Sequence, residues 1–337
     1  MTSLPDLAIV ILNYNGQDFL SRFLPSVLAN AEGATVWVAD NASTDGSVSM
    51  LRSDFPSVWI LELPTNEGYA GGYNAALQQI DAEYYCLLNS DVAVTPGWIR
   101  PVIDLFEAHP AAVACQPKIL AYHNPTQFEY AGAAGGYLDW LGFAFCRGRL
   151  FDTTETDHGQ YDDDRRVFWA SGACLFVRSY MFHQTGGFDA DFFAHMEEID
   201  WCWRVQRLGH EVWTCGQSVV HHVGAGTLAK TNPHKTFLNY RNSLLMLYKN
   251  LPGSSLWPLL LIRLVVDGIS AGPLLLRGEW AAIWAIIRAH FAFYRLLNKF
   301  SPKRKALLAT AKTSVSLYPK SIIWQYFLRG KKRFSQL

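Results

Sequence analysis

The sequence predicts an α/β fold built on a parallel sheet, and two observations lead to this prediction. Short apolar segments of strand length alternate with segments whose apolar residues recur at helical spacing. Each apolar segment also ends abruptly in polar residues. Strands that alternate with helices form parallel sheets with right-handed crossovers. Ligands bind at the carboxyl edge of such sheets, so the polar strand ends are expected to form a site.

Two strands and an intervening helix are expected in the first 40 residues. The strands span residues 7–12 and 35–39, and apolar residues between 19 and 28 recur near helical spacing. The polar residues that follow these strands are Asn13, Tyr14, Asn15 and Asp40.

A third strand, residues 58–61, precedes a glycine-rich segment at 66–74, which is expected to open a helix at Ala75. Glycines such as Gly68 and Gly72 let backbone approach a ligand, and a helix start offers free N–H groups to an anion. The segment lacks the spacing of a dinucleotide or P-loop fingerprint.

The fourth strand, residues 84–88, is cut off by Asn89, Ser90 and Asp91. A carboxylate at this edge suits a hard divalent cation such as Mg²⁺ or Mn²⁺, which keeps waters and grips the phosphates of a nucleotide. The alternative is an ordinary Asx turn after a strand.

Three carboxylates, Glu197, Glu198 and Asp200, stand before a helix that is expected to end at Gly209. Carboxylates are favoured there by the helix dipole, which is one explanation. The other is that one of them faces a cleft and acts as a general base.

Taken together, these motifs resemble the family 2 glycosyltransferases, inverting nucleotide-sugar enzymes with the GT-A fold, a Rossmann-like mixed sheet flanked by helices. The bacterial rhamnosyltransferase-like branch is the most similar, and the resemblance covers roughly residues 5 to 250. The residues that carry it are Asn13 to Asn15, Val38 to Gly46, Asn66 to Asn74, Asn89 to Asp91, Glu197 to Arg204, Gly209, and His221 with His222.

The resemblance implies a role for each strand end. Asp40 accepts a hydrogen bond from the pyrimidine base, with Tyr14 beside the ring. Asn66, Gly68 and the helix start near Gly72 lie along the ribose and diphosphate.

It also implies a metal site at Asp91. Asn89 stands at the first position of the family's Asp-x-Asp pattern, so the site offers one charged ligand where others have two. His221 or His222, after an expected strand at 216–220, completes the metal site.

The resemblance further assigns the chemistry. Glu198 is the base, Glu197 a neighbour that holds the acceptor, and Asp200 an orienting residue. The acceptor side of the cleft includes Trp169, Ser171 and Gly172, for which a core strand is the alternative.

Composition is consistent with a bacterial cytoplasmic enzyme. Half of the 337 residues are hydrophobic, enough for a large core. The six cysteines form no Cys-x-x-Cys pair and predict buried thiols in a reducing compartment. Residues 1–6 run straight into the first strand, so no leader is expected. The polar stretch 152–166, with its run of three Asp, is expected to be a mobile, exposed loop.

Two parts are expected: a catalytic domain at 1–250, with a nucleotide-binding half to about 120 and an acceptor half from about 121, and an apolar, basic helical region at 251–337. Net charge is zero, yet the residues before Trp280 carry −12 and the last 58 carry +12. Charged residues interrupt the apolar segments 256–276 and 280–297, which favours helices lying on an anionic membrane surface over membrane spans. The alternative is a soluble appendage packed on the catalytic domain, and no nucleic-acid-binding module accompanies the basic tail.

The expected function is therefore an inverting transferase that moves a sugar, with rhamnose a candidate, from a UDP- or dTDP-sugar to a glycan or lipid-linked acceptor in cell-surface polysaccharide synthesis. The expected location is the inner face of the cytoplasmic membrane. One rival, a sugar nucleotidyltransferase, needs a basic phosphate loop after its first strand, and residues 13–16 contain no Lys or Arg. The other rival is a nucleotide-sugar-binding protein without catalysis.

Overall fold

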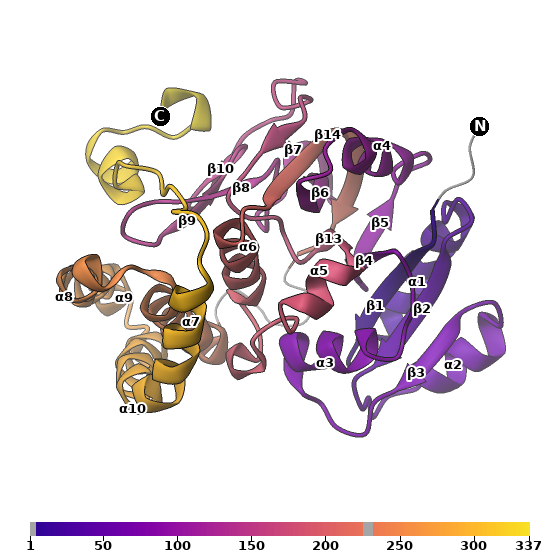
Figure 1. Ribbon diagram of the computed structural model, residues 1–337, viewed down its shortest axis with the longest axis horizontal. Helices are drawn as coiled ribbons and strands as arrows, with labels where there is room; N and C mark the ends of the chain where they lie inside the picture. The colour runs from indigo at the N-terminus through magenta and orange to yellow at the C-terminus, as the bar shows by residue number, and fades with distance from the viewer. Residues whose placement is uncertain (1–4, 225–231) are drawn as a thin grey trace.

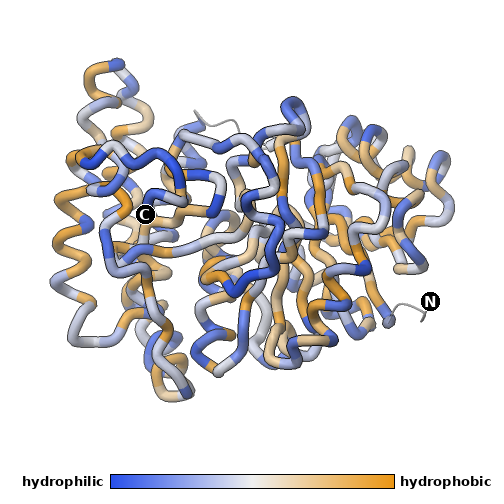
Figure 2. The backbone as a smooth tube through the Cα atoms, turned by 90° about the horizontal axis from the view of Figure 1, so that it is seen from above, coloured by the Kyte–Doolittle hydropathy of each residue, from blue (hydrophilic) through white to orange (hydrophobic). Residues whose placement is uncertain are grey.

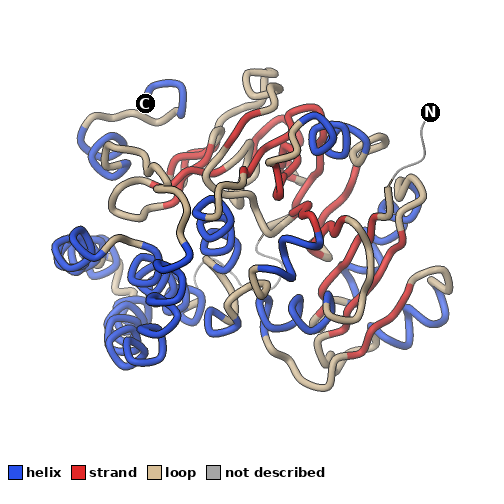
Figure 3. Tube along the Cα trace, in the orientation of Figure 1, coloured by secondary structure: helices blue, strands red, loops and turns tan. Residues whose placement is uncertain are grey.

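A computed structural model describes residues 5–224 and 232–337. Within these ranges, ten strands form one mixed sheet with helices on both faces (Figures 1 and 3). They are Leu7–Asn13 (β1), Thr35–Asp40 (β2), Trp59–Glu62 (β3), Tyr84–Asn89 (β4), Val92–Val94 (β5), Ala112–Ala121 (β6), Asn124–Phe128 (β7), Arg165–Arg166 (β12), Cys174–Arg178 (β13) and Glu211–His222 (β14). The order across the sheet is β12-β14-β6-β13-β4-β1-β2-β3, with β5 on β14 and β7 on β6. The predicted α/β class and mixed sheet are confirmed.

The first four strands are parallel, and their register places the polar strand ends side by side. Asn13 pairs with Asp40, and Leu12 pairs with Asn89. In β1 and β4 nearly every side chain is buried, as is usual for strands covered on both faces. β13 then runs antiparallel to both β4 and β6.

Helices cover the two faces of the sheet with separate hydrophobic cores. They are Gln17–Ala29 (α1), Ser47–Asp54 (α2), Gly68–Leu77 (α3), Arg100–Ala108 (α4), Ser179–Gln184 (α5) and Glu197–Arg207 (α6), with a 3₁₀ turn at Ala190–Phe192 (η1). On one face, α1, α2 and α4 contribute Leu24, Leu51 and Phe106. On the other, α3 and α6 contribute Tyr73 and Trp201, among others.

The C-terminal region forms a helical layer that shares this second core. Its helices are Pro233–Asn250 (α7), Gly253–Ser270 (α8), Gly272–Leu276 (α9) and Trp280–Thr310 (α10). Phe293 and Phe300 of α10 belong to the same buried cluster as Tyr73 of α3. The hydrophobic core therefore continues across residue 250, the expected domain boundary.

A small second sheet anchors the end of the chain. In the described part of the chain, four short strands form it: Gly136–Leu138 (β8), Ala144–Cys146 (β9), Arg149–Leu150 (β10) and Thr153–Thr154 (β11). The last segments, Trp324–Leu328 (η2, π-helical) and Phe334–Gln336 (η3), follow. Ile322 and Tyr326 pack on Phe145 and Leu150 of this sheet.

The structure corrects the expected start of the third helix. α3 begins at Gly68, seven residues before Ala75, so the glycine-rich segment is helical. A Cβ at Gly72 would lie 2.9 Å from the side chain of Leu12. Close packing on β1 therefore explains this glycine, although glycine is a poor helix former.

The acidic run of the loop at 152–166 is exposed, as expected, but it also pairs with buried cations. Lys118 Nζ lies 2.7 Å from Asp157 and also contacts Asp162. Arg147 pairs with Asp163. The run therefore ties the loop to the sheet.

Candidate active site

At the carboxyl edge of β1 and β2, Asp40 is buried and held on both oxygens. Asn13 Nδ2 donates to Oδ1 at 3.0 Å, and the backbone N–H of Ser43 donates to Oδ2 at 2.9 Å. Asn15, with φ of +51°, accepts from the N–H of Thr44 at 2.7 Å. Tyr14 remains 42% exposed at this edge. The edge thus presents a rigid carboxylate beside a free aromatic ring.

Asn41, the residue after Asp40, fixes the start of α3. Its Nδ2 donates to Asn66 Oδ1 and to the carbonyl of Gly68, both at 3.0 Å. The N–H of Gly68 in turn donates to Asn66 Oδ1 at 2.9 Å. Gly72 packs against Leu12 in the core. Of the three residues expected along the ribose and diphosphate, Asn66 and Gly68 are therefore the two at the helix start.

Of the two adjacent histidines, His222 is the one that lies beside Asp91. His222 Nε2 is 3.1 Å from Asp91 Oδ1, and His222 Nδ1 is 3.3 Å from Glu129 Oε2. Burial lowers the pKa of His222, but hydrogen bonds and ion pairs with Asp91 and Glu129 outweigh it and raise that pKa to about 10. His221 is half-buried, and burial lowers its pKa.

A divalent cation fits this arrangement in part. Asp91 supplies a carboxylate, and His222 supplies an imidazole once metal binding displaces its proton. Glu129 Oε2 lies 3.3 Å from the second ring nitrogen, on the side where carboxylates stand beside metal-bound histidines. Within the described ranges, no group of three or more His, Cys, Asp or Glu side chains is placed to hold a metal. The remaining ligands would come from substrate oxygens and water.

The carboxylates of α6 follow a loop with unusual backbone conformation. Phe193, His195 and Met196 have φ of +65°, +72° and +75°. Left-handed conformations of non-glycine residues are disfavoured and often occur at functional sites. Asn242 of α7 holds the loop, since its Nδ2 donates to the carbonyls of Phe192, Ala194 and His195 at 2.8 to 2.9 Å.

The first two carboxylates of α6 differ in protonation. Burial, followed by the charge of Glu198, raises the pKa of Glu197 well above its usual range. Burial also raises the pKa of Glu198, but backbone N–H groups at the helix start offset part of the effect, and that pKa is about 7. Each has an Oε2 that is buried and without a hydrogen-bond partner among the described residues. Glu198 is therefore poised to exchange a proton at neutral pH, while Glu197 stays protonated.

Asp200, the third carboxylate of α6, takes part in a network of ion pairs. Its Oδ2 lies 2.9 Å from Arg204 Nε and 2.8 Å from Lys249 Nζ, and Asn250 Nδ2 donates to its Oδ1 at 2.8 Å. All of these partners lie on α6 or α7. Asp200 thus joins the two helices, and any orienting effect on Glu198 acts through the position of α6.

The expected acceptor residues are mostly engaged within the protein. Trp169 is 4% exposed and donates from Nε1 to the carbonyl of Tyr137 at 3.0 Å, and Ser171 Oγ donates to the carbonyl of Ala131. Trp169 is thus buried, and it forms an isolated β-bridge with Gly136 outside the named strands. Gly172 is closer to the carboxylates: its carbonyl accepts from Tyr69 Oη at 2.6 Å.

Tyr69 connects the strand-end residues to the carboxylates. Burial raises the pKa of Tyr69 well above its usual value, and the nearby charges of Tyr73, Glu197 and Glu198 add to this. The next residue, Ala70, donates its N–H to the carbonyl of Phe193 at 3.1 Å. The start of α3 therefore packs directly on the loop before α6, which brings the two predicted constellations together.

The expected site residues did not include several that contact them or the loop before α6 in the structure. They are Asn41, Tyr69, Glu129 and Asn242. Asn41 and Tyr69 stood next to expected site residues. Glu129 and Asn242 act on residues more than 45 positions away, and no local pattern signals such contacts.

Comparisons with known proteins agree with this geometry. Residues 8–168 match the family model for glycosyl transferase family 2. The chain is 31% identical over 241 residues to an N-acetylglucosaminyl-diphospho-decaprenol L-rhamnosyltransferase of Mycobacterium tuberculosis, over 66% of this chain and 77% of that protein. It is 23% identical over 250 residues to the low-salt glycan biosynthesis hexosyltransferase Agl10 of Haloferax volcanii, over 72% of this chain and 76% of the relative.

Two solved structures are similar in fold. GalNAc-T7 with UDP, GalNAc and Mn²⁺ superposes with a TM-score of 0.59 at 16% identity, over 74% of this chain and 48% of that one. S. aureus TarS 1-349 superposes with a TM-score of 0.52 at 13% identity, over 97% and 92%. The expected GT-A fold is thereby confirmed.

Proposed function

Since the chain belongs to glycosyl transferase family 2, we propose that it is an inverting, metal-dependent transferase acting in cell-surface polysaccharide synthesis. The donor is a UDP- or dTDP-sugar, with rhamnose a candidate sugar, and the acceptor is a glycan or lipid-linked saccharide. The similarity to a decaprenol-linked rhamnosyltransferase supports this acceptor class. The observation that carries the proposal is the contact between the start of α3 and the loop before α6, where the N–H of Ala70 donates to the carbonyl of Phe193 at 3.1 Å.

Inversion follows from a single displacement with one base. The acceptor hydroxyl attacks the anomeric carbon, a new C–O bond forms, and the bond from that carbon to the diphosphate oxygen breaks. Glu198 takes the hydroxyl proton, for which a pKa near the working pH is well suited. Glu197, which stays protonated, donates a hydrogen bond to the acceptor.

The strand ends hold the donor. Asp40 accepts from the base, with Tyr14 along the ring, and Asn66 with Gly68 lines the ribose and diphosphate. Asp91 and His222 would hold Mg²⁺ or Mn²⁺, which offsets the charge that develops on the leaving diphosphate. The rigid hydrogen bonds of Asp40 and Asn41 support this assignment, because a preformed pocket loses less freedom on binding.

A donor screen tests the proposal. Thermal shifts with UDP- and dTDP-sugars, each with Mg²⁺, Mn²⁺ or EDTA, identify the donor because a bound ligand stabilises the folded state. The selected donor is then incubated with a short-chain prenyl diphosphate saccharide, and the anomeric configuration of the product is determined by NMR. An inverted, metal-dependent product is expected. Retention of configuration, or formation of a nucleotide-sugar from a nucleoside triphosphate and a sugar phosphate, would refute the proposal.

The proposal includes peripheral binding to the inner face of the cytoplasmic membrane. Gly253–Leu276 is the one segment of the described chain that is long and apolar enough to cross a membrane. Its most apolar stretch of 18 residues has a mean hydropathy of 1.9, and 22% of that stretch is buried in the protein. Figure 2 shows the hydrophobic stretches of these helices at the left-hand side of the molecule. Arg263 and Asp267 are buried and face the protein: Arg263 donates to the carbonyl of Leu141 at 2.9 Å, and Asp267 lies 3.2 Å from His290.

The charges of α8 thus point inward, and its outer face is apolar. Exposed residues on α8 and α10 include Trp257, Leu261, Val265, Ile269, Trp280, Trp284 and Phe291. A helix with an apolar outer face beside basic residues suits the plane of an anionic membrane surface.

Flotation with vesicles tests this part separately. Full-length protein should float with phosphatidylglycerol vesicles, less at high salt because screening weakens the Lys and Arg contribution. A salt-resistant fraction should remain, because the exposed Trp and Leu side chains of this face become buried in the membrane and salt does not screen that contribution. Protein that stays soluble at low salt would favour the packed-appendage alternative.

A further inference from the structure

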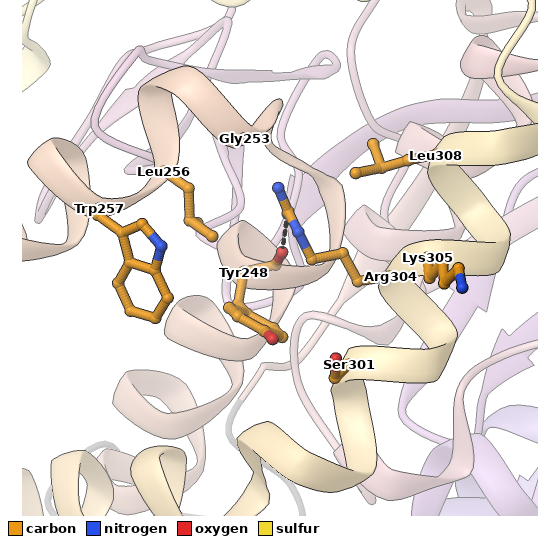
Figure 4. A pocket seen from close by; sticks show the side chains of 8 residues that line it. All are labelled: Tyr248, Gly253, Leu256, Trp257, Ser301, Arg304, Lys305 and Leu308. Atoms are coloured by element: carbon orange, nitrogen blue, oxygen red, sulfur yellow. Dashed lines mark hydrogen bonds between the residues drawn. The ribbon is translucent and has the colours of Figure 1, made fainter.

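The junction of α7, α8 and α10 contains a cavity of about 320 Å³ that the proposed reaction does not use (Figure 4). Its lining includes Tyr248 at the end of α7, Trp257 near the start of α8, and Ser301, Arg304 and Lys305 of α10. Figure 4 shows the guanidinium of Arg304 pointing from α10 toward the first residues of α8. The cavity is thus polar and basic on the side of α10 and aromatic on the side of α8.

Positive charge at this junction has no acidic partner. Arg304 donates to the carbonyl of Tyr248, and the buried Arg207 donates to the carbonyl of Asn250, so each caps the C-terminal end of α7. Within residues 5–224 and 232–337, no carboxylate lies within ion-pair distance of Arg207, Arg304 or Lys305. Arg207 Nε is also buried without a hydrogen-bond partner in those ranges.

Two neighbouring cations, Lys249 and Lys303, do have acidic partners. Lys249 lies 2.8 Å from both Asp189 and Asp200, and Lys303 pairs with Asp189 and Asp191. Burial lowers the pKa of Arg207, and the charge of Arg304 lowers it further. Burial likewise lowers the pKa of Arg304. An anion in the cavity would relieve this repulsion, and the first N–H groups of α8 would add donors.

We propose that this cavity binds the phosphate of an anionic phospholipid headgroup. The inference rests on the membrane association proposed above. Trp257 both lines the cavity and begins the exposed apolar face of α8, so a headgroup in the cavity has its acyl chains beside that face. Tryptophan is also enriched at the level of lipid headgroups.

The ligand is a membrane lipid rather than the reacting acceptor. Glu198 lies in the first turn of α6, and Arg207, next to the cavity, is the last residue of that helix. Nine residues of helix separate them by about 14 Å. A diphosphate bound at the cavity would therefore hold an attached saccharide too far from the base unless the saccharide were long.

A soluble short-chain lipid separates a defined site from diffuse attraction. Monomeric dihexanoylphosphatidylglycerol is titrated into the full-length protein and followed by calorimetry. Wild type should bind it saturably, and Arg304→Gln with Lys305→Gln should weaken binding at least tenfold. Arg295→Gln with Lys312→Gln is the matched control, because it removes the same two residue types from exposed positions on either side of the cavity along the chain.

Two results would overturn the site and leave membrane association standing. One is equal weakening of binding in the control pair. The other is wild-type protein that floats with vesicles but does not bind the short-chain lipid saturably. Inorganic phosphate that competes at the same concentration as the lipid overturns the headgroup assignment. Because Arg304 caps α7, thermal unfolding is measured in parallel. If Arg304→Gln fails to fold, Lys305→Gln alone must still weaken binding more than Lys312→Gln does.

Discussion

At the scale of single residues, the adjacent carboxylates Glu197 and Glu198 differ because they are buried unequally and helped unequally by the helix start. Backbone N–H groups stabilise the ionised form of Glu198 and bring its pKa to about 7. Glu197 lies beside that charge, and its pKa is raised further. Like charges in contact cannot both ionise easily, which divides the two roles.

Replacing the base tests this division. Glu198→Gln keeps the shape of the side chain and removes the proton acceptor, so turnover should fall by about 10² to 10⁴. Donor affinity should hardly change, as measured by calorimetry with the nucleotide. An Asp200→Asn enzyme that is folded but dead, beside a fully active Glu198→Gln, would show the assignment to be wrong.

The same substitution should change stability with pH. Burial raises the pKa of Glu198 from 4.5 to about 7, so the folded state binds the proton more tightly than the unfolded state. The free energy of unfolding therefore decreases as pH rises from about 4.5 to about 7. Glu198→Gln removes this loss and should stabilise the protein by about 1 to 3 kcal/mol at pH 8, with little effect at pH 4.5. Urea unfolding at both pH values measures the free energy of unfolding of wild type and variant. The control is Glu107→Gln, at an exposed position, whose effect on this free energy should be the same at both pH values.

At the scale of elements, the active site depends on the contact between the start of α3 and the loop before α6. Gly68 has φ of +71°, and a Cβ there would lie 2.5 Å from the carbonyl oxygen of Phe193. The same loop is held from the other side by Asn242. The position of Glu198, the proposed base, is thus set by two helices that are far apart in the sequence.

Gly68→Ala should therefore damage activity as well as stability. We expect a loss of about 2 to 4 kcal/mol, from the positive φ and from overpacking, together with a lower kcat. Gly97→Ala is the matched control: its φ is +74°, but no atom lies within 4 Å of the added Cβ. Equal effects of both substitutions on kcat would contradict the proposed coupling between α3 and the loop.

Local patterns predicted the strands and the polar residues at their ends, because strand length and abrupt changes in polarity are local properties. Asp40 and Asp91 were found in this way. The start of α3 was missed because its glycines are accommodated by packing against Leu12 and Phe193, which only the fold brings close. Glu129 was missed for the same reason, since its role depends on His222, more than 90 residues away.

At the scale of the whole molecule, one apolar surface stands apart from the catalytic edge. The C-terminal helices bury Phe293 and Phe300 in the main core, so removing the region would expose that core besides deleting the proposed membrane-binding surface. Point substitutions on the outer face are therefore a better test than truncation.

Leu261→Glu with Val265→Glu should reduce vesicle binding without unfolding the protein. These side chains are 65% and 56% exposed, so their substitution leaves the core intact, while two negative charges oppose an anionic surface. Co-sedimentation with phosphatidylglycerol vesicles gives the bound fraction, and circular dichroism checks folding. Tyr180→Glu, at a 50% exposed residue of α5, should bind vesicles nearly as wild type does. An unchanged bound fraction for the double variant would place the contact elsewhere.

The division of charge along the chain has a further consequence. The first strands and helices of the sheet (β1 to β3, α1 to α3) and the basic helix α10 lie at opposite ends of the molecule (Figure 1). The residues before Trp280 carry −12 and the last 58 carry +12, which sum to zero. A uniform electric field exerts no net force on such a body, but it exerts a torque. Near a negatively charged leaflet, within a Debye length of about 8 Å at physiological salt, the molecule is rotated before it touches. If the protein binds membranes as proposed, it would therefore arrive with α10 toward the lipid, and random tumbling would not decide which face makes first contact.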